Sequence, residues 1–254
     1  MDYKKAKRKH GYGYEKHNAI VKYGMNPTAV LALIILLFTI AVTAGVLLFL
    51  QTGWLLLLLG ALSFAVGILY SFGPIPISRM PLGEIFSGLF MGFVIIFVSA
   101  YIHAGDQLAS LSLQGGTVIL QVHLLETLLV FLISIPAILG IANIMLANNI
   151  CDMEEDIDNK RYTLPIYIGK GPALLLFKLL YYAAYVDVIV LAILGVHPLI
   201  LLLVLLTVVP VSKNIRTFTA QPTKQFTFGL SVKNFLLTNM ARILALIIAV
   251  VLPF

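Results

Sequence analysis

The chain has 254 residues, of which 60% are hydrophobic and only 11% charged, and its mean hydropathy is +1.01. Soluble domains are about 45–50% apolar and about 25% charged, so this composition excludes a soluble globular fold. It excludes disorder too, and the long apolar runs differ from the alternating segments of about ten residues in a membrane β-barrel. The sequence predicts an all-α protein, a polytopic transmembrane helical bundle.

Seven apolar stretches come close to or exceed the length of about 20 residues that a helix needs to cross the hydrocarbon core. In chain order they cover about 29–50, 54–72, 84–104, 120–147, 172–194, 197–212 and 234–253. Pro74, Pro76 and Pro81 separate the second stretch from the third, because proline ends or kinks a helix. The whole chain, 1–254, is interpreted as one integral membrane domain.

Lysine and arginine are confined to alternate connections between these stretches. They are Lys4, Lys5, Lys7, Arg8, Lys9, Lys16 and Lys22 before the first stretch, Arg79 in the second connection, Lys160, Arg161 and Lys170 in the fourth, and Lys213, Arg216, Lys224 and Lys233 in the sixth. Basic loops stay in the cytoplasm, so the loops over 1–28 and 148–171 are predicted to be cytoplasmic, in a multi-pass protein of the cell membrane. These basic connections hold 15 of the 17 Lys and Arg residues, which explains the positive net charge of the chain, and no nucleic-acid partner is expected.

A few charged residues and glycines lie inside the predicted spans. For Arg242, snorkelling or pairing with a backbone carbonyl is favoured over a functional role. Glu126 and Asp187 are near the outer ends of their spans and are expected at the membrane interface. Gly88 and Gly92 form a small-xxx-small pair that favours close helix packing.

An acidic motif follows the fourth span. Five of the chain's eleven acidic residues fall between positions 152 and 158. If the span continues as a helix at 100° per residue, Asn148, Asn149, Glu155 and Asp156 lie within about 60° of Asp152. Carboxylates on one helix face repel each other, and a bound cation offsets that cost.

The ligand chemistry of this face favours Mg²⁺. Its donors are oxygen atoms with no His or Cys cluster nearby, and proteins commonly hold Mg²⁺ by one or two carboxylates plus substrate phosphates. Lys160 and Arg161 follow directly and are suited to bind phosphate oxygens. The pattern therefore predicts a metal–diphosphate site at the cytoplasmic interface.

The alternative is a solvated helix end with charges of both signs, which is common at protein surfaces. Asn148 and Asn149 argue against it, because they lie where the apolar span should still be running and polar groups are costly there.

Three stretches resemble one known family. The run Asn148-Asn149-x-x-Asp152-x-x-x-Asp156, with Asn159-Lys160-Arg161-x-Thr163-Leu164 and Gly169, resembles the second aspartate-rich motif of the UbiA superfamily of intramembrane aromatic prenyltransferases. Tyr70 to Pro76, with Arg79 and Leu82-Gly83-Glu84, resembles a loop in the menaquinone-pathway branch. Asn18 to Val21, through Gly24 to Pro27, resembles the segment just downstream of the family's first motif. The resemblance spans essentially the whole chain.

The resemblance implies a reaction as well as a fold. It implies Mg²⁺, a polyprenyl diphosphate donor and the acceptor 1,4-dihydroxy-2-naphthoate, whose carboxylate is lost as CO₂ to give demethylmenaquinone. The residues that it assigns are Asp152, Asp156, Glu155 and Asp2 for the metal, and Asn148, Asn149, Lys160 and Arg161 for the diphosphate. An apolar cavity among the helices would take the prenyl tail and exclude water.

Tyr70, Arg79 and Glu84 are further candidates. Arg79 is the only cation of its connection and is suited to bind the acceptor's carboxylate or the diphosphate, so it is assigned with Asp152 and Asp156 as catalytic. Glu84 is suited to orient Arg79 or to take a proton. Tyr70 is included as catalytic, with an interfacial aromatic residue as the alternative.

The start of the chain departs from the family. The family's first motif, Asn-Asp/Asn-x-x-Asp, lies at the cytoplasmic end of its second helix, and the family has nine spans. Here Asp2 matches only the closing aspartate, and seven spans are predicted. We expect two further helices upstream of Met1, so that the sequence is a fragment or starts at an internal methionine.

Three alternatives remain open at this point. The first is another aromatic acceptor within the superfamily. The second is a transporter or another non-catalytic membrane protein, although no internal repeat is visible and the acids gather at one interface rather than at mid-membrane. The third is a chain that is inactive because it carries half of the metal site.

Overall fold

The computed structural model describes residues 19–74, 76–196 and 199–251. Asp2 and most of the predicted basic loop over 1–28 lie outside these residues. In the described part, seven helices are long and apolar enough to cross a membrane, and each overlaps one of the seven predicted spans. The prediction of a polytopic all-α bundle is confirmed, and the chain is a multi-pass membrane protein.

The spans follow one another in chain order. They are α3 (Pro27–Thr52), α4 (Trp54–Ser71), a third span made of α5 (Gly83–Ser87), the π-helical η3 (Gly88–Val94), α6 (Ile95–Ala104) and η4 (Gly105–Gln107), then α7 (Leu124–Cys151), α10 (Lys170–Ile193), a sixth made of η5 (Leu199–Thr207) and α11 (Val208–Ala220), and α12 (Gly229–Val251). The short helices between them are α2 (Ala19–Tyr23), η2 (Ile77–Arg79), α8 (Met153–Asp158) and α9 (Leu164–Ile168).

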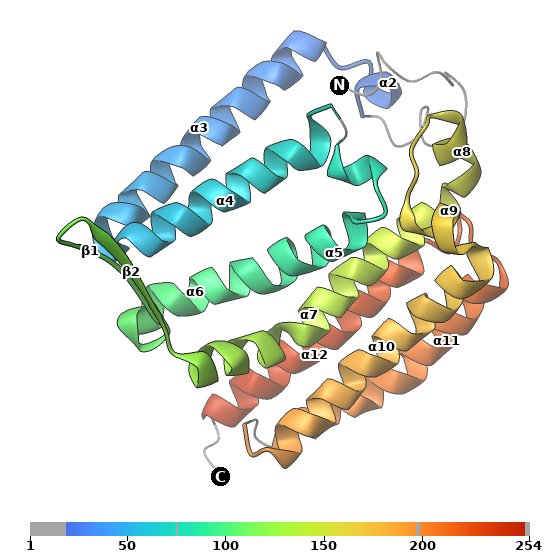
Figure 1. Ribbon diagram of the computed structural model, residues 1–254. Coiled ribbons are helices and arrows are strands. Elements are labelled where there is room, and N and C mark those ends of the chain that lie inside the picture. Colours follow the sequence, from blue (N-terminus) through green and yellow to red (C-terminus); the bar gives the residue numbers. More distant parts are fainter. Residues whose placement is uncertain (1–18, 75, 197–198, 252–254) are drawn as a thin grey trace.

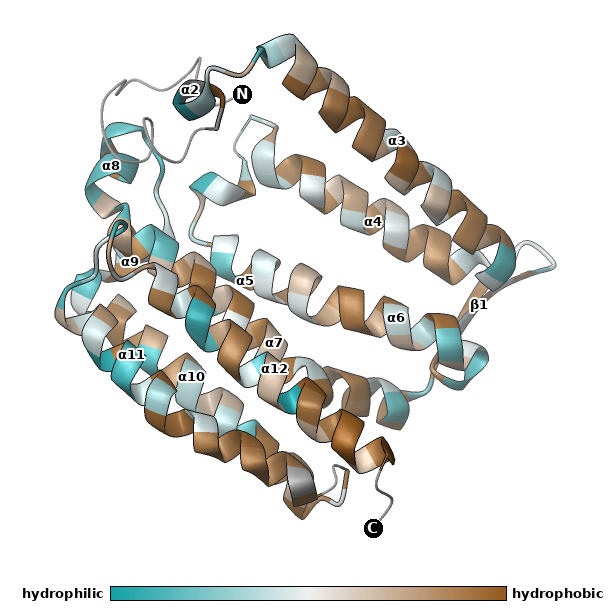
Figure 2. Cartoon of the chain, turned by 180° about the vertical axis from the view of Figure 1, so that it is seen from behind, coloured by the Kyte–Doolittle hydropathy of each residue, from teal (hydrophilic) through white to brown (hydrophobic). Residues whose placement is uncertain are grey.

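The spans lie side by side as a fan of helices (Figure 1). Helices α3 and α4 form one edge, α10 and α11 the other, and α7 and α12 run between them. The short helices α8 and α9 lie at one end of the bundle with α2, and the strands lie at the opposite end. Figure 2 shows hydrophobic residues along most of α3 and hydrophilic residues over α8, as a membrane-embedded bundle with one polar end requires.

The packing is densest around α7, which contacts the third span, α10 and α12. Two of its contacts with the third span are possible only because the residue that faces α7 is a glycine, which has no side chain. A Cβ at Gly92 would lie 2.6 Å from the Cα of Ile138, and one at Gly88 would lie 2.9 Å from the carbonyl oxygen of Ile138. The close packing predicted for Gly88 and Gly92 is confirmed. On the other side of α7, the rings of Phe177 and Phe218 lie with centroids 4.6 Å apart in the core.

One element was not predicted. Strands β1 (Ala109–Gln114) and β2 (Thr117–Val122) form an antiparallel hairpin, in which Gln114 pairs with Thr117. Gly115 and Gly116 make its turn with φ of 56° and 84°, a conformation that glycine adopts without strain. The fourth span therefore begins at Leu124 rather than at the predicted position 120.

The sixth span is longer than the predicted 197–212. It continues to Ala220 because α11 is amphipathic. Val211, Ile215 and Phe218 recur at helical spacing and are buried, while Lys213 and Arg216 on the other face are exposed. The two cations were interpreted as part of a loop, but in the structure they lie on the exposed face of α11.

Three charged residues inside the spans differ in burial: one is exposed, and two are buried in the bundle. Glu126 is exposed, in agreement with the prediction. Asp187, also expected at the interface, is only 7% exposed within the protein, and Arg242 is close enough to interact with it electrostatically. Arg242 also donates a 2.8 Å hydrogen bond to the carbonyl oxygen of Ile133, which is the structural pairing expected for it.

Candidate active site

The acidic motif lies where α7 ends. Helix α7 stops at Cys151, and Asp152 adopts φ −102° and ψ 8° before α8 begins at Met153. The span therefore does not continue as the unbroken helix on which the common face was predicted. After α8 the chain turns back at Lys160, whose φ of 55° lies in the left-handed region. The backbone N–H of Arg161 then donates to the carbonyl of Asp156 over 2.8 Å and closes the turn.

Asp152 and Asn148 face a lysine from a distant loop. The ammonium group of Lys224 donates hydrogen bonds to Oδ2 of Asp152 and to Oδ1 of Asn148. Lys224 lies in the connection between α11 and α12, and sequence reasoning counted it only as one cation of that connection. Its neighbours in the chain carry no motif, so no local signal marked it as part of the site.

Asp156 is held by a different set of partners. The Nε atom of Arg161 lies 3.4 Å from its Oδ1, and the Thr163 hydroxyl donates to its Oδ2 over 3.3 Å. Only 3% of Asp156 is exposed. Burial raises the pKa of the Asp156 carboxyl to about 6, although the nearby Arg161 guanidinium acts in the opposite direction.

Asn149 and Glu84 connect the motif to the third span. The Asn149 amide donates to Oε1 of Glu84 over 2.9 Å, and the other carboxylate oxygen of Glu84 is buried without a hydrogen-bond partner in the described part of the chain. The Asn148 amide donates in turn to Oδ1 of Asn149 over 3.5 Å. Tyr70 is close by, because its hydroxyl would lie 3.6 Å from a Cβ at Gly83.

A second contact joins the motif loop to the turn that carries Arg79. Arg161 donates from Nη2 to the carbonyl of Ser78 over 3.3 Å. The backbone N–H of Tyr162 donates to the carbonyl of Arg79 over 3.0 Å. The turn at η2 is thereby fixed beside the acidic motif, as the candidate assignment of Arg79 requires.

The remaining predicted site residues are less enclosed. Lys160 is exposed and Glu155 is half-buried, and Asp2 lies outside the described residues. Within residues 19–74, 76–196 and 199–251, no group of three or more His, Cys, Asp and Glu side chains is arranged to hold a metal. A metal here would need amide and substrate oxygens as well as carboxylates.

The donor set fits such a metal. Carboxylate and amide oxygens are the ligands that Mg²⁺ prefers, with substrate phosphates and water completing its shell. Oδ1 of Asn148 and Oδ2 of Asp152 already converge on one positive group, the ammonium of Lys224. The two side chains can therefore face a common cation without rearrangement of the helix that carries them.

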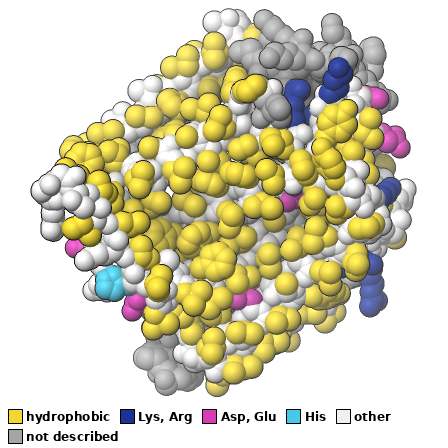
Figure 3. Space-filling view, viewed as in Figure 1, with side chains coloured by type: hydrophobic (Ala, Val, Ile, Leu, Met, Phe, Trp, Pro, Cys, Tyr) yellow, Lys and Arg dark blue, Asp and Glu magenta, His cyan; other side chains and the backbone are white. Residues whose placement is uncertain are grey.

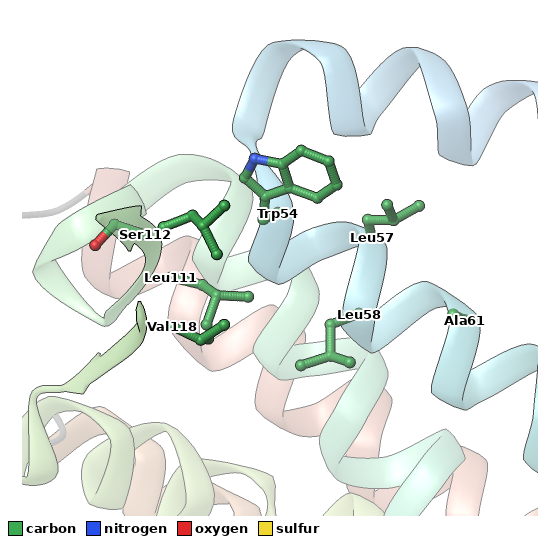
Figure 4. Close-up of a pocket in the computed structure, with 8 residues that line it drawn as sticks. Trp54, Leu57, Leu58, Ala61, Leu111, Ser112 and Val118 are labelled. Carbon is green, nitrogen blue, oxygen red and sulfur yellow. The ribbon is translucent and has the colours of Figure 1, made fainter. Parts of the chain in front are cut away.

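Two apolar pockets lie farther along the spans. One, of about 440 Å³, is lined by α3, α4, η3 and α6 and includes Gly45, Phe64 and Val98. The other, of about 400 Å³, lies between α4 and the hairpin (Figure 4). Leu57 and Ala61 line both pockets, so the same stretch of α4 borders each of them.

The fold and the site together define a class of protein: a multi-pass helical membrane protein with an acidic, amide-containing polar site at one end of the bundle. Residues 8–231 match the model of the UbiA prenyltransferase family. The chain belongs to that family, which confirms the resemblance noted in the sequence.

One curated relative gives a more detailed comparison. The chain is 36% identical over 177 residues to the 1,4-dihydroxy-2-naphthoate octaprenyltransferase of Bacillus subtilis (strain 168). The match covers 70% of this chain and 51% of the relative, so the chain spans about half the length of the relative. No solved structure gives a significant match.

Proposed function

We propose that the chain is a prenyltransferase that moves a polyprenyl group from polyprenyl diphosphate to 1,4-dihydroxy-2-naphthoate, with formation of demethylmenaquinone and loss of CO₂. The observation that carries this proposal is the convergence of Asn148 and Asp152 on one cation position, with buried Asp156 one helical turn away. Family membership and the name of the Bacillus subtilis relative support the donor and the acceptor.

The residues that would hold Mg²⁺ are Asp152 and Asp156, with the amide oxygens of Asn148 and Asn149 assisting. Glu155 and Asp2 remain proposed additional ligands. When bound, the metal supplies positive charge to the diphosphate as it leaves. Arg161 and Lys160, which follow the motif, are proposed to neutralise further negative charge on the same group.

The acceptor would bind on the side of the third span. We propose that Arg79 binds the carboxylate of the naphthoate, because the η2 turn that carries it is fixed to the motif loop. Glu84 has a buried carboxylate oxygen without a hydrogen-bond partner among the described residues, which suits it to accept the proton of the acceptor. Tyr70 lies beside this position and would orient the ring.

The prenyl tail would run along α4. Tyr70 is at the polar end of that helix, and Gly60, which lines the larger apolar pocket, is ten residues or about 15 Å away along the helix. The pocket walls are apolar, as the hydrocarbon tail of a polyprenyl group requires.

The site end of the bundle is proposed to face the cytoplasm, in the cell membrane. Lys and Arg side chains gather at the end that carries α8, whereas the histidine in view lies near the opposite end (Figure 3). This asymmetry follows the positive-inside rule. The chain is proposed to act as one membrane domain, 1–254, with the loops over 1–28 and 148–171 on the cytoplasmic side.

The test is prenyl transfer by the purified full chain in lipid nanodiscs, with polyprenyl diphosphate, 1,4-dihydroxy-2-naphthoate and MgCl₂. We expect product with MgCl₂ and none with EDTA. Asp152→Asn and Asp156→Asn should each lower turnover by about 100-fold or more, as loss of a metal ligand does. Glu154→Gln is the matched control, because Glu154 is an exposed acid of the same helix.

Two results would contradict the proposal. One is normal turnover by both aspartate variants. The other is preference for a different aromatic acid, such as 4-hydroxybenzoate, over 1,4-dihydroxy-2-naphthoate in the same assay. The first result would remove the metal role of the motif, and the second would replace the acceptor.

A further inference from the structure

Lys224 lies inside the acidic site although its loop is distant in the sequence. Its ammonium group contacts Asp152 and Asn148, and only 13% of its side chain is exposed. Both oxygen atoms belong to the set proposed to hold Mg²⁺. A lysine ammonium and a divalent metal cannot share these two oxygens, because they would repel each other at contact distance.

The loop that carries Lys224 is ordered by its own hydrogen bonds. The buried Thr227 hydroxyl donates to the carbonyl of Gln221 over 2.8 Å and accepts from the backbone N–H of Thr223 over 2.8 Å. The backbone N–H of Phe228 donates to the carbonyl of Thr223 over 3.0 Å. The position of the lysine is therefore set by the fold and not by the charge of Asp152 alone.

The side chain of Lys224 also rests on an aromatic ring. Its ammonium lies 5.0 Å from the centroid of Phe228, within the range of a cation–π interaction. Lysine carries its charge on a flexible four-carbon stem, so its ammonium group can change partners without movement of the loop. If a metal held the oxygens of Asp152 and Asn148, a diphosphate bound with it would offer the displaced ammonium group a new negative partner.

We propose that Lys224 occupies the metal position while the site is empty and moves to the diphosphate when a divalent metal displaces it. The inference rests on the proposed function and adds a residue to it. Two consequences follow. Lys224 weakens metal binding in the absence of substrate, and it strengthens diphosphate binding in the presence of metal. The affinities for the two ligands are thereby coupled through one side chain.

The first measurement is a Mn²⁺ titration of the full chain in nanodiscs, followed by electron paramagnetic resonance without substrate. Lys224→Gln should bind Mn²⁺ about tenfold more tightly than the unmodified chain, since a competing positive charge is gone. Lys224→Arg should bind it as weakly as the unmodified chain. The matched control is Lys233→Gln, the same charge change at an exposed position of α12, which should alter the affinity by less than about twofold.

The second measurement is calorimetric titration with inorganic pyrophosphate at saturating MgCl₂. Lys224→Gln should bind pyrophosphate about tenfold more weakly than the unmodified chain, because a charge-assisted contact is lost. Lys233→Gln should bind it unchanged. A Lys224→Gln chain with unaltered or weaker Mn²⁺ affinity overturns the inference, and so does one with unaltered pyrophosphate affinity.

The outcomes separate this inference from the proposed function. An unmodified chain that binds no Mn²⁺ and transfers no prenyl group contradicts the proposed function itself. If the unmodified chain instead binds Mn²⁺ and transfers the prenyl group while Lys224→Gln gives the same result in both titrations, that outcome contradicts only the role of Lys224. Thermal unfolding shows whether Lys224→Gln is misfolded. In that case Lys224→Arg is the deciding variant: it should keep the Mn²⁺ and pyrophosphate affinities of the unmodified chain, and a change in either would overturn the inference.

Discussion

Asn149 and Glu84 form a buried hydrogen bond of 2.9 Å that ties the last turn of α7 to the first turn of α5. Their exposed fractions are 2% and 4%. The bond fixes the orientation of the Asn149 amide, so that its oxygen is left for the Asn148 amide or for a cation. We therefore expect Glu84 to act on the proposed metal site through Asn149, as partners of metal ligands commonly do.

Glu84→Ala should lower the affinity for Mn²⁺ by about 10-fold or more, because Asn149 loses the group that orients it. Glu84→Gln keeps an oxygen acceptor at the same place and should retain more of the affinity. The measurement is the Mn²⁺ titration in nanodiscs, with Glu154→Ala as the exposed control. Equal Mn²⁺ affinity in the Glu84→Ala chain and the unmodified chain would show that Asn149 is oriented by other contacts.

Arg161→Lys should lower kcat/KM for polyprenyl diphosphate by about tenfold. The guanidinium reaches Asp156 with Nε and the carbonyl of Ser78 with Nη2, and a single ammonium group cannot make both contacts. Steady-state transfer assays at varied donor concentration provide the test. Arg216→Lys is the control, since Arg216 is exposed on α11. If both variants behave alike, the link between the two loops has no part in the reaction.

Gly92→Ala should destabilise the bundle by about 1–3 kcal/mol, the usual cost of overpacking. The new methyl group would lie 2.6 Å from Cα and 2.7 Å from N of Ile138, and backbone atoms cannot move aside as a flexible side chain can. Thermal unfolding in detergent measures the effect. Gly67→Ala on α4 meets no atom within 4 Å and should unfold as the unmodified chain does. A Gly92→Ala chain of unchanged stability would mean that η3 and α7 separate at little cost.

Asp187→Ala should destabilise the chain by about 3 kcal/mol, because it leaves Arg242 in the helical core without its opposing charge. The double variant Asp187→Ala with Arg242→Met should recover most of the loss, since neither charge is then buried. Thermal unfolding compares the two, with Glu126→Ala as the exposed acidic control. A double variant no more stable than Asp187→Ala would show that Arg242 acts through its bond to Ile133 instead.

The number and approximate positions of the spans were predictable, because length, apolar composition and the alternation of basic loops leave few choices in a bilayer. The hairpin was not, since a search for long apolar runs passes over strands as short as β1 and β2. Arg242 was expected to pair with a carbonyl and does. The interaction of Arg242 with Asp187 was not predicted, because the two residues lie on different helices and the sequence does not show which helices meet.

The site was predictable only where its residues are neighbours in the chain. The motif from Asn148 to Asp156 could be recognised from its spacing. The turn at Asp152 could not, and it separates the surroundings of Asp152 from those of Asp156. Lys224 joins the site through the packing of α11 and α12 beside α7, a relation that no local pattern records.

Helix α3 and helix α7 differ in what surrounds them. No side chain of α3 is buried against the described part of the chain, whereas α7 buries residues along most of its length, among them Ser134, Asn143 and Asn149. Any apolar residue of similar size satisfies a position that faces lipid, but a position enclosed by three neighbouring helices accepts few. Among the described spans, α7 should therefore hold the most slowly changing stretch of the related sequences.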